Sequence, residues 1–262
     1  MNKRLDQHLA DEGLFESRER ARAAVMEGDV RVDGSSDVKP GTRLKGGEKI
    51  TVEDRKPDFV SRGGLKLAGA LEDLGLDVSG VDALDVGAST GGFTDCLLQR
   101  GAARVIALDV GRGQLHWKLR QDARVTVIER LNARRLAPGD LPWAPGFATV
   151  DVSFISLAKV VLPVAKTLLP GGRLLTLVKP QFEAGKGGAP GGVVRDDSTL
   201  REVLFSMRDL MTRHGLTAVD LTPSRIRGPK GNAEFFLLVD TTRGVQVTER
   251  MIDQAITNAP PR

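Results

Sequence analysis

The stretch that decides the fold is Leu84-Asp85-Val86-Gly87-Ala88-Ser89-Thr90-Gly91-Gly92-Phe93-Thr94, an apolar strand that runs through a glycine loop into a helix. Strand and helix patterns alternate from there onward, which is the signature of a parallel sheet with helices on both faces. We predict seven strands, over residues 81–86, 105–109, 125–129, 148–152, 173–178, 216–221 and 234–239. The clearest helices are predicted over residues 91–100, 157–168 and 198–214.

The connection between the last two strands differs from the others. Residues 222–233 are rich in proline and glycine and have no helical period. A right-handed crossover between parallel strands usually contains a helix, so we expect the final strand to be antiparallel to its neighbours. The predicted fold is therefore an α/β Rossmann-like seven-stranded sheet whose last strand is reversed.

The N-terminal segment predicts a separate small α+β module over residues 1–52. Helices are expected over residues 4–12 and 18–27, with Ser17 as N-cap of the second and Gly28 ending it. Residues 30–32 alternate before the turn Asp33-Gly34, a hairpin signal, and residues 49–52 form a further candidate strand. Residues 53–60 are charged without apolar period and are interpreted as a linker, which leaves residues 61–262 for the sheet domain.

Composition excludes several classes of protein. The only cysteine is Cys96, so an internal disulfide or a cysteine-rich zinc site is excluded, and three distant histidines argue against a metal site. No apolar run approaches a membrane span, and no signal-type core follows the N-terminus, so we expect a cytoplasmic, metal-free protein without membrane contact. The net charge of +4 permits a polyanionic partner. Residues 1–60, however, contain 12 Lys and Arg against 13 Asp and Glu, so any RNA binding there depends on local patterning.

The glycine loop is a candidate cofactor site. No lysine follows its last glycine and the spacing is not G-x-G-x-x-G, which disfavours a P-loop and a dinucleotide. Asp109 ends the second strand, where a carboxylate can accept both hydroxyls of an adenosine ribose, so the pattern favours S-adenosylmethionine. The predicted cofactor residues are Asp85, Gly87, Ala88, Ser89, Thr90, Gly91, Gly92, Phe93 and Asp109. The alternative is that these are tight-turn glycines and that Asp109 is a helix cap.

Three more polar residues lie at strand ends. Asp151 and Lys179 close two strands, and Glu234 opens the last one. If that strand is antiparallel, all three meet at the carboxyl edge, where open α/β sheets bind ligands. Lys66, in the helix that begins after Ser61-Arg62-Gly63-Gly64, can reach the same edge from the side. Taken singly, each of these residues is also explained as a solvated strand end.

Two lysines and two carboxylates suit the methylation of a ribose hydroxyl. The hydroxyl is a poor nucleophile until it loses its proton. A lysine can take that proton only if the pKa of its ammonium is lowered, and a second ammonium nearby lowers it. We predict Lys179 as general base, with Asp151 positioning it and steadying the sulfonium methyl. Lys66 and Glu234 are predicted orienting partners.

Several blocks together resemble the TlyA family of ribosomal RNA 2′-O-methyltransferases, once described as haemolysins. These blocks are Ser61-Arg62-Gly63-Gly64-Leu65-Lys66-Leu67, Asp85 to Phe93, Asp151-Val152-Ser153-Phe154-Ile155-Ser156 and Val178-Lys179-Pro180-Gln181-Phe182-Glu183. The resemblance covers almost the whole chain. It implies a catalytic domain similar to the FtsJ-type enzymes, whose Lys-Asp-Lys-Glu tetrad falls on Lys66, Asp151, Lys179 and Glu234.

Residues 3–52 resemble a small RNA-binding module found in a small-subunit ribosomal protein and in pseudouridine synthases. Ser17-Arg18 and residues 28–34 show that likeness. It implies RNA contacts at Arg4, Arg18 and Arg22, for which a solvated helix face is the alternative. The linker departs from the family, because Pro57-Asp58-Phe59-Val60 stands where some members have Arg-x-Trp-Val. Residues 185–192 are interpreted as a mobile lip over the site or a long surface loop.

The resemblance implies transfer of a methyl group to a cytidine ribose of small- or large-subunit ribosomal RNA. The expected partners are therefore ribosomal RNA or ribosomal subunits, with no obligate protein partner evident. One alternative is a non-catalytic RNA-binding assembly factor with a vestigial methyltransferase fold. A third hypothesis, the membrane-active haemolysin of the older family description, lacks a membrane-inserting segment in this sequence.

Overall fold

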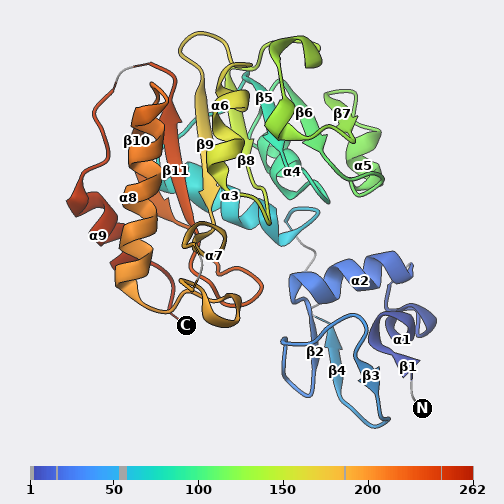
Figure 1. The fold of residues 1–262 in the computed structure, drawn as a ribbon. Helices are drawn as coiled ribbons and strands as arrows, with labels where there is room; N and C mark the ends of the chain where they lie inside the picture. Colours follow the sequence, from blue (N-terminus) through green and yellow to red (C-terminus); the bar gives the residue numbers. More distant parts are fainter. Residues whose placement is uncertain (1–2, 16, 53–57, 186, 243, 262) are drawn as a thin grey trace. The chain divides into compact units, whose positions relative to one another are not determined.

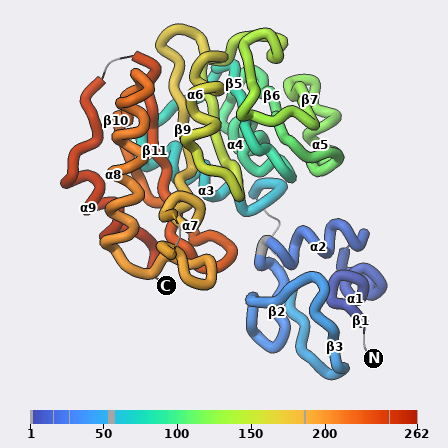
Figure 2. Tube along the Cα trace, viewed as in Figure 1, coloured from blue at the N-terminus to red at the C-terminus, as the bar shows by residue number. Residues whose placement is uncertain are grey.

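The computed structural model describes residues 3–15, 17–52, 58–185, 187–242 and 244–261. The chain divides into two compact units, Met1–Pro57 and Asp58–Arg262. Figure 1 shows the elements of each unit, and Figure 2 traces the chain through them. Among the described residues, no helix has the length and the apolar character needed to cross a membrane.

The first unit is built on two helices, α1 (Leu5–Asp11) and α2 (Arg18–Glu27). The predicted caps of α2 are confirmed, since the Ser17 side chain accepts a hydrogen bond from Arg20 N and Gly28 has a φ of 83°. Leu5, Leu9 and Ala21 are fully buried between the two helices and the strands. These residues form the small core of the first unit.

The strands of the first unit are short. They form two antiparallel pairs, β1 (Lys3–Arg4) with β3 (Arg43–Leu44) and β2 (Val30–Val32) with β4 (Ile50–Val52). The predicted turn is present, because Val32 and Ser35 form a bridge across Asp33-Gly34. The strand that pairs with β2 is nevertheless β4, which is distant in sequence. The pair β1–β3 was not predicted, since two residues contain no recognisable period.

The second unit contains one seven-stranded sheet. Its strands are β5 (Asp82–Val86), β6 (Arg104–Asp109), β7 (Val125–Glu129), β8 (Phe147–Val150), β9 (Arg173–Val178), β10 (Thr217–Pro223) and β11 (Phe235–Asp240). Their order across the sheet is β10-β11-β9-β8-β5-β6-β7. β11 is antiparallel to both β9 and β10, whereas the other pairs are parallel. The predicted fold class and the reversed last strand are thus confirmed.

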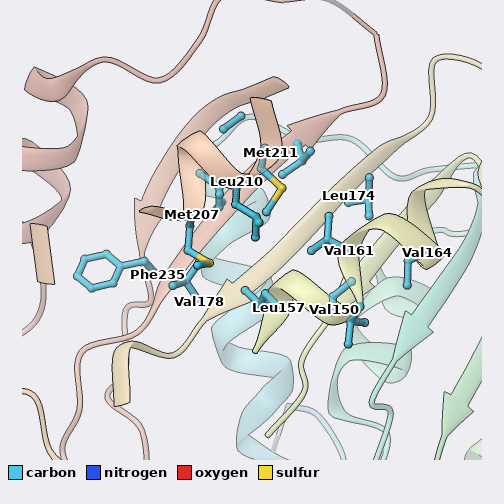
Figure 3. Close-up of a cluster of buried hydrophobic side chains, with 14 of the residues drawn as sticks. Val150, Leu157, Val161, Val164, Leu174, Val178, Met207, Leu210, Met211 and Phe235 are labelled. Atoms are coloured by element: carbon cyan, nitrogen blue, oxygen red, sulfur yellow. The ribbon is translucent and has the colours of Figure 1, made fainter. Parts of the chain in front are cut away.

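Helices cover both faces of this sheet, as Figure 1 shows. One face packs against α3 (Arg62–Asp73), α4 (Gly92–Gln99) and α5 (Trp117–Arg120). The other packs against α6 (Val161–Ala165), α8 (Asp197–Arg213) and α9 (Glu249–Thr257). Figure 3 shows the second core, where Leu174 and Val178 of β9 meet Met207 and Met211 of α8. Because side chains alternate along a strand, Leu175 and Leu177 enter the opposite core.

Short elements complete the second unit. They are α7 (Pro180–Glu183) and the 3₁₀ turns η1 (Ala133–Arg135), η2 (Pro138–Asp140), η3 (Leu157–Lys159) and η4 (Pro190–Gly192). The single helix predicted over residues 157–168 is wrong, since this segment divides into η3 and α6. Pro163 explains the division, because it has no N–H to donate and is tolerated only in the first turn of α6.

The predicted linker differs at its C-terminal end. Phe59 and Val60 were expected in the linker, but they belong to the second unit and pack in its core. Phe59 is buried against α3, where a Cβ on Gly64 would lie 2.3 Å from the Phe59 Cβ. Val60 N donates to Asp95 Oδ2 at 2.8 Å. Of the rest of that predicted linker, Asp58 is exposed, and residues 53–57 lie outside the described residues.

Candidate active site and cofactor pocket

Strand register brings the predicted catalytic residues to one edge of the sheet. Phe235 pairs with Val178 in the antiparallel β11–β9 ladder, so Glu234 and Lys179 both lie just beyond this pair. Val150 of β8 pairs with Thr176 of β9, and Asp151 follows Val150. The two carboxylates and Lys179 therefore lie at the ends of three adjacent strands, β11, β9 and β8.

The first of two lysine–carboxylate pairs joins Lys179 and Asp151. Lys179 Nζ lies 2.5 Å from Asp151 Oδ1, and the two side chains are 11% and 22% exposed. The same Nζ donates to Ser153 Oγ at 2.9 Å. The amine is thus held from two sides by residues of one loop, with a small exposed fraction through which a substrate can reach it.

The second pair joins Lys66 of α3 and Glu234. Lys66 Nζ lies 2.6 Å from Glu234 Oε2, and the side chains are 11% and 1% exposed. Gly228 gives the carboxylate its space, because a Cβ there would lie 2.4 Å from Glu234 Oε1. The loop before β11, which lacks a helix, thereby closes tightly over Glu234.

The loop after β8 is attached to the segment after β9. Glu183 Oε1 accepts a hydrogen bond from Leu157 N at 2.8 Å, and burial raises the pKa of the Glu183 carboxyl. Phe154 has a φ of 62° and is 90% exposed, and its ring centroid lies 5.1 Å from that of Phe182. A bulky residue in the left-handed region is uncommon and indicates a constrained loop. This constraint fixes Ser153 and Asp151 relative to Lys179.

The predicted cofactor acid, Asp109, organises the glycine loop. Its two oxygens accept from Ser89 N at 2.9 Å and from Gly111 N at 2.7 Å. A pocket opens beside it at the carboxyl ends of β5, β6 and β7. The pocket is lined by Ala88, Ser89, Ala107, Asp109, Gly111, Gln114, Leu115, Val127 and Glu129.

The glycines of this loop are constrained by contacts within the protein. A Cβ at Gly87, whose φ is 85°, would lie 2.2 Å from the Asp151 carbonyl oxygen, and one at Gly91 would lie 2.3 Å from Leu119 Cδ1. Gly92 allows α3 and α4 to approach, since its Cβ would lie 2.3 Å from Ser61 Oγ. These glycines are therefore required by contacts within the protein, and at Gly87 the contact links the cofactor loop to the catalytic loop.

Several predicted cofactor residues lie behind the pocket. Phe93 is buried against Phe236, with ring centroids 5.9 Å apart, and the Thr90 carbonyl accepts from His116 N. Asp85 is fully buried, and its carboxylate accepts from Thr94 Oγ1 at 2.7 Å and from Thr149 Oγ1 at 3.0 Å. Ala88, Ser89 and Asp109 are the predicted residues that line the pocket itself.

The buried Asp85 predicts a pH dependence of stability. Burial raises its pKa from 3.8 to about 7, against the opposing effect of its threonine hydrogen bonds. The folded protein therefore keeps a proton that the unfolded chain releases between about pH 4 and 7. We expect the free energy of unfolding to fall as the pH rises through this range, by the order of a few kcal/mol from this group.

Urea unfolding of the wild type and of Asp85→Asn between pH 4.5 and 7.5 measures this effect. The variant has no carboxyl group at this position, so its stability should decline less with rising pH than that of the wild type. Parallel curves for the two proteins would show that Asp85 has no raised pKa.

The sequence interpretation missed polar residues on this edge. Glu129 ends β7 directly beside Asp109, and it accepts from Gly113 N at 2.8 Å. The rule that identified Asp109, an acid closing a parallel strand, could have identified Glu129. Ser153 and Gln114 have no comparable signal, because both lie in loops whose conformation depends on tertiary contacts.

The three predicted RNA-contact arginines lie in the first unit. Arg18 and Arg22 are exposed on α2, and Arg4 is exposed at the end of β1. Arg4 and Arg18 both donate to the carboxylate of Asp6, which is buried. The structure thus brings two of the three together on a residue that the sequence interpretation did not consider.

Comparisons with known proteins agree with this architecture. Residues 59–241 match the FtsJ-like methyltransferase family, and residues 3–50 match the S4 domain. The chain is 42% identical over 258 residues to the 16S/23S rRNA (cytidine-2′-O)-methyltransferase TlyA of Mycobacterium tuberculosis, covering 98% of this chain and 96% of that protein. It is 40% identical over 234 residues to a Brachyspira hyodysenteriae protein named Hemolysin A, covering 88% and 97%.

A solved structure is similar to this chain over nearly its whole length. The structure, described as that of a hemolysin from Streptococcus thermophilus, is 41% identical and has a TM-score of 0.76, covering 98% of this chain and 96% of that one. The FtsJ-like match spans most of the larger unit, and the relatives and this structure span most of the chain. The chain therefore belongs to the TlyA family of methyltransferases, in which an RNA-binding S4 domain precedes an FtsJ-like catalytic domain.

Proposed function

We propose that this enzyme transfers a methyl group from S-adenosylmethionine to a ribose 2′-hydroxyl of ribosomal RNA, with cytidine as the target nucleoside. The observation that supports the proposal best is the presence of two lysine–carboxylate pairs, Lys179–Asp151 and Lys66–Glu234, at the strand ends of a methyltransferase sheet. The related M. tuberculosis enzyme is named for cytidine 2′-O-methylation, which supports the choice of acceptor.

The pocket residues fit the adenosine part of the cofactor. Asp109 and Glu129 end adjacent strands and offer carboxylate oxygens to ribose hydroxyls, while Ala107, Leu115 and Val127 offer apolar contacts to a base. When bound, S-adenosylmethionine supplies a sulfonium methyl group that an oxygen nucleophile can attack. Asp151 joins this pocket to the catalytic pair, because its backbone oxygen abuts Gly87 and its side chain pairs with Lys179.

The catalytic proposal assigns the general base to Lys179. In its neutral form the amine takes the proton of the 2′-hydroxyl as the oxygen attacks the methyl group, and the ammonium that results is held by Asp151 and Ser153. Lys66 and Glu234 then orient the ribose from the neighbouring strand end. Methyl transfer requires in-line alignment of the reacting atoms, so rigid support of these side chains is the main contribution of the fold.

The substrate reaches this edge as an unpaired nucleotide in our proposal. Phe154 is 90% exposed beside Ser153, and its ring offers a stacking surface for a base. Aromatic stacking is a common way for proteins to hold a splayed RNA base. The S4 domain supplies further RNA binding through Arg4, Arg18 and Arg22, and ribosomal RNA or ribosomal subunits are the proposed partners.

The packing of the chain also supports a division into domains. We propose an RNA-binding module of residues 1–52, a connecting segment of residues 53–58 and a catalytic domain that starts at residue 59, two residues before the start expected from the sequence. Phe59 and Val60 support ending the connecting segment before them, since both pack on the catalytic unit. An enzyme acting on ribosomal RNA is proposed to work in the cytoplasm.

Two measurements test the proposed function. Calorimetry with S-adenosylmethionine should detect binding, and its absence would favour the non-catalytic assembly factor. Tritium from the labelled methyl group should then appear in small or large ribosomal subunits incubated with the enzyme. Nuclease digestion and mass spectrometry should recover the label as 2′-O-methylcytidine. Label on a base would refute the ribose acceptor, and label on another 2′-O-methylated nucleoside would refute cytidine.

A further inference from the structure

The S4 domain contains a charged side chain that is almost completely buried. Asp6 is 1% exposed, although it lies on the first turn of α1 between the core residues Leu5 and Leu9. Arg4 Nε and Nη2 donate to its two oxygens at 3.0 and 2.9 Å, and Arg18 Nε donates to Oδ2 at 3.2 Å. One carboxylate thus joins the end of β1 to the start of α2.

The two arginines differ from Asp6 in their exposure. Their side chains are 47% and 48% exposed, so each guanidinium reaches the surface while Asp6 remains beneath it. A guanidinium has five N–H donors, and Asp6 engages only three of the ten in this pair. The cluster of Arg4, Asp6 and Arg18 has a net charge of +1, whereas the surrounding segment is close to neutral.

The geometry of the cluster is fixed from several sides. Arg4 pairs with Arg43 in the β1–β3 ladder, and a Cβ on Gly41 would lie 3.1 Å from Arg4 Nη1. Arg18 is the first residue of α2, directly after the N-cap Ser17. The hydrogen bonds from Arg4 hold the pKa of Asp6 near 2, so the carboxylate stays ionised at neutral pH. A buried charge of this kind is stable only while its partners are in place.

We propose that Asp6 is a positioning residue that holds Arg4 and Arg18 together as one phosphate-binding fork for the RNA backbone. The inference rests on the proposed function, because it names how the S4 domain grips ribosomal RNA. Two guanidiniums fixed side by side lose little side-chain entropy when they bind one phosphate or two adjacent ones. If only the total charge mattered, Asp6 would lower the affinity for RNA, because an aspartate beside two arginines weakens their attraction for phosphate. Removing Asp6 would then strengthen binding.

The test measures binding of the full-length protein to ribosomal RNA extracted from ribosomes, by filter binding over a series of KCl concentrations. We expect Asp6→Asn to bind about tenfold more weakly at low salt and to have a salt-dependence slope lower by about one, as for the loss of one phosphate contact. Asp11→Asn is the matched control. This variant removes a carboxylate of the same helix, one that pairs with Lys3 and not with the arginines. The affinity of the variant for RNA should therefore not decrease.

A second variant keeps the proposal testable if Asp6→Asn unfolds the domain, which hydrogen exchange in α1 and α2 would reveal. Arg4→Lys preserves the charge at an exposed position, but a lysine cannot donate to both oxygens of Asp6 in the two-bond geometry of Arg4. We expect it to lose affinity severalfold, whereas a purely coulombic role predicts no loss. If the wild type binds RNA and the folded Asp6→Asn variant binds equally well or more tightly, the role of Asp6 is refuted but the RNA-binding role of the domain is not. No binding by the wild type would overturn the proposed RNA-binding role as well.

Discussion

Replacement of Lys179 by Met should reduce methyl transfer by about 10²- to 10⁴-fold, the usual contribution of a general base. Methionine keeps most of the volume of a side chain that is only 11% exposed, so the fold should persist. The adenosine pocket lies at the ends of β5, β6 and β7 and does not include Lys179. Calorimetric affinity for S-adenosylmethionine should therefore stay close to that of the wild type while the single-turnover rate falls.

The controls separate the amine from its surroundings. Lys166→Met removes an exposed lysine at the C-terminus of α6, near the opposite edge of the sheet, and should leave transfer unchanged. Ser153→Ala removes one acceptor of the Lys179 hydrogen bonds and should have a smaller effect than loss of the lysine itself. A small primary amine added to Lys179→Ala should restore part of the rate. Near-wild-type transfer by Lys179→Met would refute the assignment of the base.

The placement of Lys179 and its neighbours could be predicted from sequence because it depends on strand ends. A buried apolar strand is recognisable as a short run, and the residue that follows it must lie at the sheet edge. The antiparallel direction of β11 could also be predicted, because residues 222–233 cannot form a crossover helix. With β11 antiparallel, Glu234 had to lie on the same edge as Asp151 and Lys179.

Contacts between distant segments could not be predicted in this way. The glycine loop was recognised, but Gly87 is required by the backbone of Asp151, which is 64 residues away and invisible to any local pattern. A charged residue such as Asp6 would be expected on a solvated helix face. In the structure it is buried, and one of its hydrogen-bond donors, Arg18, belongs to the other helix, α2. Phe59 was assigned to a linker because its partner, Gly64, has no side chain to mark an apolar surface. In each case the residue that makes the contact is not marked by any periodic pattern in the sequence.

The second large effect is expected at the Lys66–Glu234 pair. Glu234→Gln leaves the Lys66 ammonium 11% exposed and without its carboxylate at 2.6 Å. Breaking a buried pair from one side costs about 3–5 kcal/mol, which for a domain of this size lowers the melting temperature by about 10 °C. Methyl transfer should fall as well, because the orienting pair at the edge of β11 is lost. The measurements are thermal unfolding and single-turnover transfer at a temperature where the variant is folded.

The double variant Lys66→Met/Glu234→Met separates stability from catalysis. With both charges removed, no buried ion is left unpaired, and such replacements are often neutral or stabilising. We therefore expect the melting temperature to recover much of the loss, while transfer remains as low as in Glu234→Gln. Arg124→Met, which breaks a surface ion pair with Asp122, is the control and should change stability by about 1 kcal/mol or less. Recovery of both stability and transfer in the double variant would show that the pair only supports the fold.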